Sequence, residues 1–106
     1  MISIQDFAKL EIRIAEILEA APHPNADRLY VLKVKAGETV KQLVAGIRPF
    51  YGADELKGKK VVLIDNLEPA VIRGVESQGM LLAASDGTDL TLVTPERPIS
   101  VGTKVK

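Results

Sequence analysis

Two neighbouring stretches in which apolar and polar residues alternate constrain this chain more than any other feature. In the first, Leu29 to Ala36, the apolar Leu32 and Val34 alternate with outward-facing positions, and the second runs from Thr39 to Ala45. A period of two is typical of strands with one buried face. The connection between them contains Gly37, so the sequence predicts an antiparallel hairpin over an apolar core.

The length of this connection sets the expected register. A three-residue connection, Ala36-Gly37-Glu38, places Lys33 opposite Lys41. The same register places Val34 opposite Val40 and keeps the apolar residues on one face. The outer face then carries Lys33, Lys35 and Lys41. Opposed like charges cost a sheet roughly 0.2 to 1 kcal/mol, so this face predicts either a bound polyanion or a solvated surface with Glu partners.

Four later segments also have the character of short strands. They are Val61–Ile64, Gly79–Ala84, Leu90–Thr94 and a last one near Thr103–Val105. Asp86 and Gly87 form a turn signal between the second and the third segment. The opening of the chain is ambiguous, because its apolar residues recur at helical spacing while Leu10, Ile12 and Ile14 alternate as in a strand.

Composition and length exclude several classes of protein. With 106 residues and 46% hydrophobic content, the chain suits a single domain, residues 1–106, around one core. It contains no cysteine and one histidine, so we expect no metal, no cofactor and no thiol chemistry. The apolar runs are too short to span a membrane, and Met1 to Leu10 lacks the order of a signal peptide. We therefore expect a soluble protein of the cytoplasm.

The charges balance overall but are unevenly distributed. The chain has fourteen Lys and Arg residues and fourteen Asp and Glu residues, so its net charge is zero, which argues against an indiscriminate polyanion binder. The segment from Arg28 to Lys60 nevertheless has eight basic residues and three acidic ones. The chain lacks Trp and has few other aromatic residues, so stacking on bases cannot dominate. This combination favours a folded RNA that is bound by its shape and its phosphates.

Five segments, spread over nearly the whole chain, match the pattern of a known family. They are Asp6–Ile14, Pro22–Tyr30, Val44–Ile47, Glu55–Lys60 and Asn66–Ala84. Together they resemble the tRNA-binding OB domain family, whose members are free-standing or lie at the C-terminus of methionyl-tRNA synthetases. The resemblance implies an all-β fold: an OB-fold five-stranded barrel with a short N-terminal helix and a C-terminal extension. In such a barrel Arg13, on the first strand, points away from the core, as Lys33 does on the second.

The resemblance also implies a surface for RNA. In the family, the residues at the positions of Asn66, Ser77 and Met80 belong to the RNA-contacting surface. By this implication Asn66 and Ser77 donate to sugar or phosphate, and Met80 packs on a ribose or an exposed base. The alternative is that Asn66 and Ser77 cap turns and that Met80 fills the core.

The chain departs from the family pattern in the segment that follows Asn66. Members commonly carry basic residues where this chain has Ala70 and Val71, and Glu68 stands where Lys is frequent. The departure predicts weaker binding, for which Arg73 compensates in part. The residues expected to bind RNA are Arg13, Lys33, Lys35, Lys41, Asn66, Arg73, Ser77 and Met80.

Two residues near the start of the second strand have open interpretations. Tyr30 either contacts RNA or is a strand residue at the sheet margin. His23 lies between Pro22 and Pro24, whose fixed φ angles hold it at the surface. There it is either a phosphate contact or a plain loop side chain.

The resemblance implies tRNA and the catalytic region of a methionyl-tRNA synthetase, fused or associated, as partners. It further implies a homodimer formed by the N-terminal turn and the C-terminal extension. Two alternatives remain: a peptide-binding export chaperone of the same fold family, and a pure dimerisation module. Exposed lysines favour RNA, whereas a continuous exposed apolar patch would favour peptides. Catalysis is not expected, because no His or Lys is placed to activate Ser77 and no phosphate-loop motif occurs.

Overall fold

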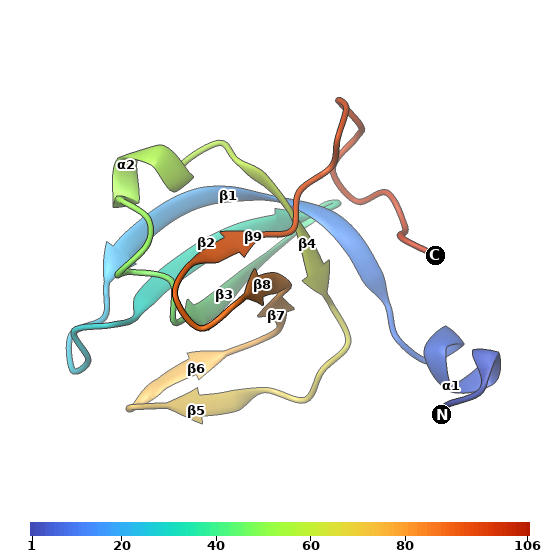
Figure 1. The fold of residues 1–106 in the computed structure, drawn as a ribbon, viewed down its shortest axis with the longest axis horizontal. Coiled ribbons are helices and arrows are strands. Elements are labelled where there is room, and N and C mark those ends of the chain that lie inside the picture. Colours follow the sequence, from blue (N-terminus) through green and yellow to red (C-terminus); the bar gives the residue numbers. More distant parts are fainter.

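A strongly curled antiparallel sheet of five strands forms the centre of the protein (Figure 1). The computed structural model describes residues 1–106. The strands are β1 (Ile12–Pro22), β2 (Tyr30–Ala36), β3 (Thr39–Ala45), β4 (Lys60–Ile64) and β7 (Met80–Leu81). Their order across the sheet is β3-β2-β1-β4-β7. This mostly β, curled arrangement confirms the OB-type fold expected from the sequence.

The long strand β1 bends around the molecule and makes the curl possible. Its first half pairs with β4 and its second half pairs with β2. A β-bulge between Ile17 and Glu19 interrupts the pairing with β2 and adds to the bend. The N–H of Gln78, just before β7, donates to the carbonyl of Gln42 on β3 at 2.8 Å. The two edges of the sheet are thereby linked, and the sheet closes toward a barrel.

Two short helices and two hairpins complete the fold. They are α1 (Ile4–Ala8), α2 (Ala53–Leu56), the hairpin of β5 (Ala70–Ile72) and β6 (Val75–Ser77), and the hairpin of β8 (Ala83–Ser85) and β9 (Leu90–Leu92). Helix α1 begins where the hydroxyl of Ser3 accepts the N–H of Asp6, and it projects from the barrel (Figure 1). The opening segment is thus a short helix followed by a strand, as the resemblance implied. No helix has the length and apolarity needed to cross a lipid bilayer.

The later strands are shorter than the sequence predicted. The expected strand Gly79–Ala84 is divided into β7 and β8, because the backbone of Leu82 bonds to two different segments and does not continue one ladder. The expected strand Leu90–Thr94 is limited to β9. Near Thr103–Val105 an isolated bridge to Arg13 forms in place of a strand.

The turn between β8 and β9 follows the prediction. The Asp86 carboxylate accepts the N–H groups of Asp89 and Thr88 at 2.8 and 2.9 Å, and Gly87 has a φ of +91°. These hydrogen bonds hold the pKa of the Asp86 carboxyl below its ordinary value.

The apolar residues form two layers, one inside the barrel and one outside it. The largest fully buried side chains of the inner layer are Ile17, Leu32, Val34, Leu43, Leu56, Val61 and Leu63. The outer layer lies on the opposite face of β1 and β4 and consists of Ile12, Ile14, Val62 and Ile64. Phe7 and Leu10 from the N-terminal region, and Val105 from the other end of the chain, pack against this outer layer. Both ends of the chain therefore help to cover the same side of the barrel.

The β2–β3 hairpin has a different register from the one predicted. Its turn contains two residues, Gly37-Glu38, and not three, with Gly37 at a φ of +74°. Lys33 therefore lies opposite Gln42, and Lys41 lies opposite the buried Val34. A shift of one residue moves every side chain of a strand to the other face. The prediction that three lysines share the outer face is wrong for Lys41.

Candidate nucleic-acid interface

The outer face of β2 and β3 keeps two of the three predicted lysines. Lys33 Nζ donates to Gln42 Oε1 at 2.8 Å, and Lys35 is exposed. Each has an acidic neighbour on β1, with Glu19 beside Lys33 and Glu16 beside Lys35. Neither lysine belongs to an ion pair. The face is therefore of mixed charge, and its two ammonium groups remain accessible to an anion.

A group of charged residues closes one end of the barrel. This barrel-end ion cluster consists of Glu11, Arg13, Lys41, Asp65 and Lys104. The Lys41 ammonium lies 2.6 Å from Asp65 Oδ1, and it donates to the Asp65 carbonyl at 2.6 Å. The two side chains are 23% and 21% exposed, so the pair is largely shielded from water. Lys41 thus contacts the protein itself and not the outer face.

Arg13 belongs to the same cluster. On β1 it lies opposite the fully buried Leu63 of β4, so its side chain starts from the inner face of the sheet. Its guanidinium donates to the Gly102 carbonyl at 3.0 Å and lies 3.2 Å from Glu11 and 3.7 Å from Asp65. The prediction that Arg13 points away from the core is wrong, because alternation along β1 gives the outer face to its two neighbours.

Asn66 ties the chain that enters β1 to the end of β4. Its Oδ1 accepts the N–H of Glu11 at 2.8 Å, and its Nδ2 donates to the Lys9 carbonyl at 2.8 Å. The side chain is exposed, and one amide proton has no partner within the protein. Contact between Asn66 and RNA therefore stays a prediction.

Ser77 is buried where β6 meets β3. It is 5% exposed, and its hydroxyl accepts the N–H of Val44 at 3.0 Å while it donates to the Gly79 carbonyl at 3.2 Å. Its single proton is therefore already in use. The hydroxyl completes the backbone pairing at the edge of β3, as the alternative of a structural role expected, and contact between Ser77 and RNA stays a prediction.

Met80 lies at the surface, at the start of β7. Its side chain is 48% exposed, so the alternative that it fills the core is wrong. It borders an apolar pocket of about 210 Å³ whose other lining residues belong mainly to β3, β7, β8 and β9 and the segment after β3. Packing of Met80 on a ribose or a base stays a prediction.

The loop between β1 and β2 is tied to the β5–β6 hairpin. His23 is 4% exposed; its Nδ1 accepts the N–H of Asn25 at 2.9 Å, which leaves the proton on Nε2 to bond the Ile72 carbonyl at 3.0 Å. Asn25 Nδ2 donates to the Arg73 carbonyl at 3.1 Å, and Arg73 Nη2 donates to the Asn25 carbonyl at 3.0 Å. The expectation that His23 lies at the surface is wrong, because both ring nitrogens bond within the protein.

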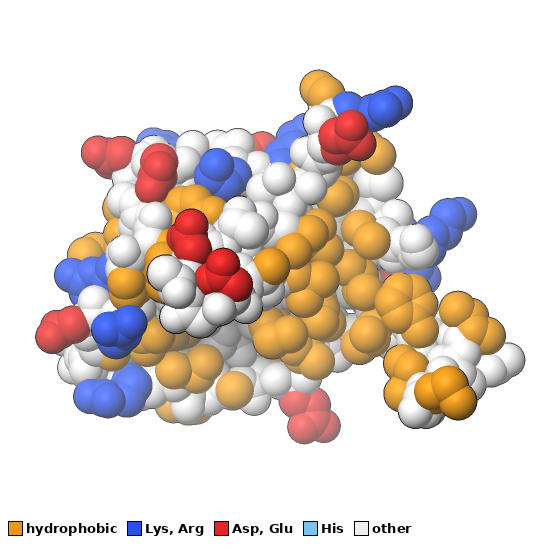
Figure 2. Space-filling model, in the orientation of Figure 1, with side chains coloured by type: hydrophobic (Ala, Val, Ile, Leu, Met, Phe, Trp, Pro, Cys, Tyr) orange, Lys and Arg blue, Asp and Glu red, His pale blue; other side chains and the backbone are white.

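Three arginines gather around this loop. We call Arg28 in the loop, Arg48 after β3 and Arg73 at the tip of the β5–β6 hairpin the arginine cluster. Arg48 Nη1 donates to the Ala26 carbonyl at 3.5 Å, and its guanidinium lies 6.0 Å from the centre of the Tyr30 ring. Basic side chains gather over the loop and the hairpin tip at the lower left of Figure 2. None of the three arginines belongs to an ion pair.

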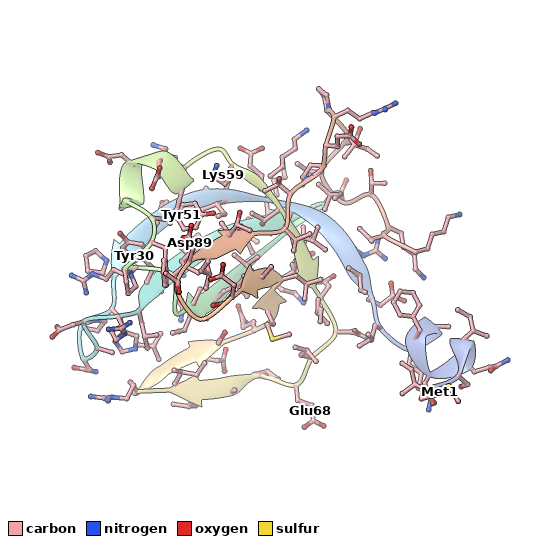
Figure 3. All side chains as sticks on the ribbon, viewed as in Figure 1. Met1, Tyr30, Tyr51, Lys59, Glu68 and Asp89 are labelled. Carbon is pink, nitrogen blue, oxygen red and sulfur yellow. The ribbon has the colours of Figure 1, made fainter.

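Both tyrosines have structural partners. Tyr30 is 6% exposed and donates its hydroxyl proton to the Tyr51 carbonyl at 2.7 Å. The Tyr51 hydroxyl accepts the N–H of Leu92 at 3.0 Å. Figure 3 shows the two tyrosines close together beneath α2. Tyr30 is thus a strand residue and does not offer a platform for bases.

Sequence reasoning selected Arg73 but missed Arg28 and Arg48 as its neighbours. Their one signal was membership of the basic segment from Arg28 to Lys60. That signal does not show which cations meet in space. The arrangement brings cations together, and such a group of positive charges is suited to an anion. No group of acidic or histidine side chains is placed to hold a metal ion.

Comparisons with known proteins add a family to this description. A family model described as a putative tRNA binding domain matches residues 12–104. The methionine–tRNA ligase of Nanoarchaeum equitans is 50% identical over 106 residues, which are 100% of this chain and 14% of that protein. The chain spans 14% to 16% of the length of these curated relatives.

Two solved structures have the same fold over their full lengths. A MetRS related protein from Pyrococcus horikoshii has a TM-score of 0.92 and 29% identity, with 100% of this chain and 98% of that chain covered. The CsaA chaperone protein from Picrophilus torridus has a TM-score of 0.92 and 32% identity, with 100% of both chains covered.

Proposed function

Since the chain belongs to the family of putative tRNA binding domains, we propose that it binds folded tRNA through shape and phosphate contacts. The family match over residues 12–104 is the observation that carries this proposal. We further propose that the domain serves a methionyl-tRNA synthetase, fused to it or associated with it, by raising the local concentration of tRNA. The domain itself is not catalytic, and its ligase relatives are about seven times longer, since it spans 14% of them.

The surface chemistry supports phosphate contact over base stacking. Lys33 and Lys35 lie on the outer face of β2 and β3, the face that OB folds use for oligonucleotides. Both tyrosines are engaged inside the protein. Met80 adds an exposed apolar contact of the kind that can pack on a ribose. These residues fit a ligand that is held mainly by its charge and shape.

A salt titration of binding to bulk tRNA tests the proposal. We expect affinity to fall with a log-log slope of roughly −0.7 to −0.9 for each phosphate contacted. Replacing Lys33 and Lys35 together with Ala should weaken both affinity and slope. The double variant Glu16→Gln with Glu19→Gln should have the opposite effect, a higher affinity and a steeper slope, because it removes the acidic neighbours of the two lysines. Unchanged binding in a folded double-lysine variant would contradict the role of this face.

We also propose a homodimer that forms through α1 and the C-terminal extension, the two chain ends that pack against the outer apolar layer. Ile2 and Ile4 are 74% and 72% exposed, next to a groove of about 450 Å³ lined by Ile4, Phe7 and Leu10. Figure 2 shows apolar side chains from the middle of this face to α1. An exposed apolar patch of this kind indicates association with another protein surface. A twofold dimer would present two RNA surfaces to one ligand.

Light scattering at micromolar protein tests the dimer. We expect a mass of twice the 11.5 kDa chain in moderate salt. The double variant Ile2→Glu, Ile4→Glu should reduce the mass to one chain, because four introduced carboxylates per dimer cannot be buried together. A wild-type mass near 11.5 kDa would contradict the dimer.

The likeness to a CsaA chaperone favours a second candidate, the binding of unfolded polypeptides. The apolar pocket beside Met80 is the feature that such a ligand would use. Apolar binding weakens little with salt, whereas RNA binding weakens steeply. Titrating tRNA and an unfolded polypeptide in the same salt series separates the two candidates. Binding of the polypeptide alone would favour the second.

A further inference from the structure

Strand β8 has one edge that no other strand covers. It belongs to a sheet of two strands and pairs with β9 alone. The register pairs are Ala83 with Leu92, Ala84 with Thr91 and Ser85 with Leu90. All three residues of β8 are exposed, so the second edge of this strand lies open to solvent.

Two residues of β8 direct their backbone groups to the open edge. In an antiparallel ladder, pairs that exchange hydrogen bonds alternate with pairs whose N–H and C=O groups point away from each other. The N–H of Leu92 donates to the Tyr51 hydroxyl at 3.0 Å, so Leu92 and its partner Ala83 form a pair of the second kind. Ser85, two positions further, is of the same kind. No other segment hydrogen bonds to the backbone of Ala83 or Ser85.

The apolar pocket beside Met80 borders this strand. Ala83 lines it, together with Leu90 and Leu92. Cross-strand partners project from the same face of a sheet, so Ala83 and Leu92 mark the face of the hairpin that turns toward the pocket. The pocket has a volume of about 210 Å³. An apolar cavity of about 150 Å³ can hold benzene, so the pocket has room for one large apolar side chain.

An acidic hollow adjoins the pocket. Its volume is about 290 Å³, and Leu90 lines both cavities. Its other lining residues include Ser85 and the two carboxylates of Asp86 and Asp89. Neither carboxylate belongs to an ion pair, and no Lys or Arg lines either cavity. Figure 2 shows acidic side chains beside apolar ones on this face. The hollow therefore attracts a cation and repels the phosphates of RNA.

The two cavities have the spacing of an extended polypeptide. Ala83 lines the apolar pocket, and Ser85, two residues along the same strand, lines the acidic hollow. Side chains at positions i and i+2 of a strand lie on one face. A strand added to β8 would therefore present one side chain to the pocket and the next on that face to the hollow. In such complexes main-chain hydrogen bonds give affinity, and pockets for alternate side chains give specificity.

We propose that β8 binds an extended segment of a partner protein as an added strand. A large apolar side chain of the segment fills the pocket, and a Lys or Arg two positions away lies in the acidic hollow. The backbone groups of Ala83 and Ser85 pair with the segment. Since β8 has only three residues, the binding is weak and reversible. The inference goes beyond the proposed binding of tRNA and does not rest on it, and it gives the polypeptide candidate a site and a sequence pattern.

The main test titrates blocked peptides into the 15N-labelled protein. The probes are Ser-Thr-Leu-Thr-Lys-Thr-Ser and its reversed sequence, because the cavities do not set the direction of the added strand. The control, Ser-Thr-Thr-Leu-Lys-Thr-Ser, has the same composition but places Leu and Lys on opposite faces. We expect saturable shifts of the Ala83 and Ser85 amide signals at millimolar concentration of one probe, and no saturation with the control. Equal binding of probes and control would overturn the proposal, as would the absence of shifts with both probes.

Ser85→Pro tests the main-chain pairing. Proline removes an outward N–H that has no partner in the fold, at an edge position where proline is tolerated. We expect the better probe to bind about fivefold more weakly, measured at the Ala83 amide, because one hydrogen bond is lost. Ser85→Ala is the matched control, since it removes the same hydroxyl but keeps the N–H, and it should bind as the wild type does. Equal affinities of the two variants would overturn the added strand.

Asp89→Asn tests the acidic hollow. The amide oxygen can still accept the N–H of Leu90, as the carboxylate does at 2.8 Å, so the change removes charge and keeps the turn. Binding of the Lys probe should weaken roughly two- to threefold, whereas a probe with Gln in place of Lys should bind unchanged. Asp54→Asn, at an exposed position on α2 outside both cavities, is the matched control. Unfolding curves check that each variant is folded. Equal losses for the two probes would overturn the cation site.

Two further measurements separate this site from the other proposals. Titration of tRNA into the same samples should show wild-type affinity for Ser85→Pro. Peptide shifts without any tRNA binding would support the added strand and overturn the proposed function, whereas tRNA binding without peptide shifts would overturn the added strand alone. Shifts of the Ala83 and Ser85 amides on dilution of the protein by itself would also overturn it, because a second copy would then occupy the edge.

Discussion

The barrel-end ion cluster and the arginine cluster are both rich in basic residues, yet they differ in what those residues contact. At the barrel end, Lys41 and Arg13 lie 2.6 and 3.7 Å from the Asp65 carboxylate. Around the β1–β2 loop, Arg48 and Arg73 donate to backbone carbonyls, and no carboxylate is within ion-pair distance. The existing partner of a basic residue therefore decides whether that residue is available to a polyanion.

The energetic reason is the cost of giving up an existing contact. To reach a phosphate, Lys41 would leave the largely buried Asp65 without its nearest cation. Removing one partner of a fully buried ion pair costs about 3 to 5 kcal/mol, which a phosphate contact at the surface does not return. Arg73 gives one N–H to a carbonyl and keeps further donors for a ligand. We therefore assign stability to the first cluster and binding to the second.

Asp65→Ala should give the largest effect. It removes the carboxylate that holds both Lys41 and Arg13, so we expect the free energy of unfolding in urea to fall by about 2 kcal/mol. This value lies between those of exposed and fully buried pairs, because Asp65 is 21% exposed. The variant gains one net positive charge, so tRNA affinity of the folded protein should not decrease. Glu11→Gln, in the same cluster but more exposed, is the control with a smaller effect.

A drop in tRNA affinity on Asp65→Ala, measured where the variant is fully folded, would break the division between the clusters. It would mean that the barrel end contacts RNA through the arrangement that Asp65 maintains.

Ser77→Ala should cause the second largest loss of unfolding free energy. Ser77 belongs to neither cluster, but it joins β3 to the hairpin that carries Arg73. Its loss leaves the partly buried N–H of Val44 without a partner, which costs about 1 to 2 kcal/mol, less than for a fully buried group. Ser85→Ala is the matched control, because Ser85 is exposed and should change stability little. Chemical denaturation measures both variants. A stable Ser77→Ala protein with weaker RNA binding would restore Ser77 as an RNA contact.

Lys41→Ala and Arg28→Ala compare one residue from each cluster directly. Lys41→Ala should lower the free energy of unfolding by about 1 kcal/mol and leave the salt slope of tRNA binding unchanged. Arg28→Ala should leave stability within about 0.5 kcal/mol and reduce the salt slope by roughly 0.7 to 0.9. Urea unfolding and salt titration on the same two samples check both. A reduced salt slope for Lys41→Ala together with a lower stability for Arg28→Ala would contradict the roles given to the two clusters.

Met80→Ala should have a small effect on both stability and binding. A fully buried Met would lose roughly 2 to 5 kcal/mol on truncation, and we expect less than about 1 kcal/mol because Met80 is 48% exposed. Its tRNA affinity should fall modestly, whereas Met80→Leu keeps the apolar contact and should bind as the wild type does. A large fall in the unfolding midpoint on Met80→Ala would show that its packing against the pocket is structural.

The elements were predictable because their signals are local. Alternation assigned Leu32 and Val34 to the core, and Asp86-Gly87 marked its turn. The register of the β2–β3 hairpin was not predictable in this way, because a two-residue and a three-residue turn both fit the glycine at position 37. Because the turn is one residue shorter than predicted, Lys41 lies at the barrel end and not on the outer face.

Alternation and turn residues predicted the β2–β3 hairpin, the later strands and the basic segment from the sequence, because these signals act over short stretches of chain. The OB-type fold and the family came from the resemblance of five segments to a known family. Which basic residues have no carboxylate partner depends on the folding of the whole chain. Asp65 meets Lys41 and Arg13, and Arg28 meets Arg73, across large separations along the chain. An ion pair forms only when the two charged groups are a few ångströms apart. The curl of the sheet sets those distances, and no local sequence pattern predicts the curl.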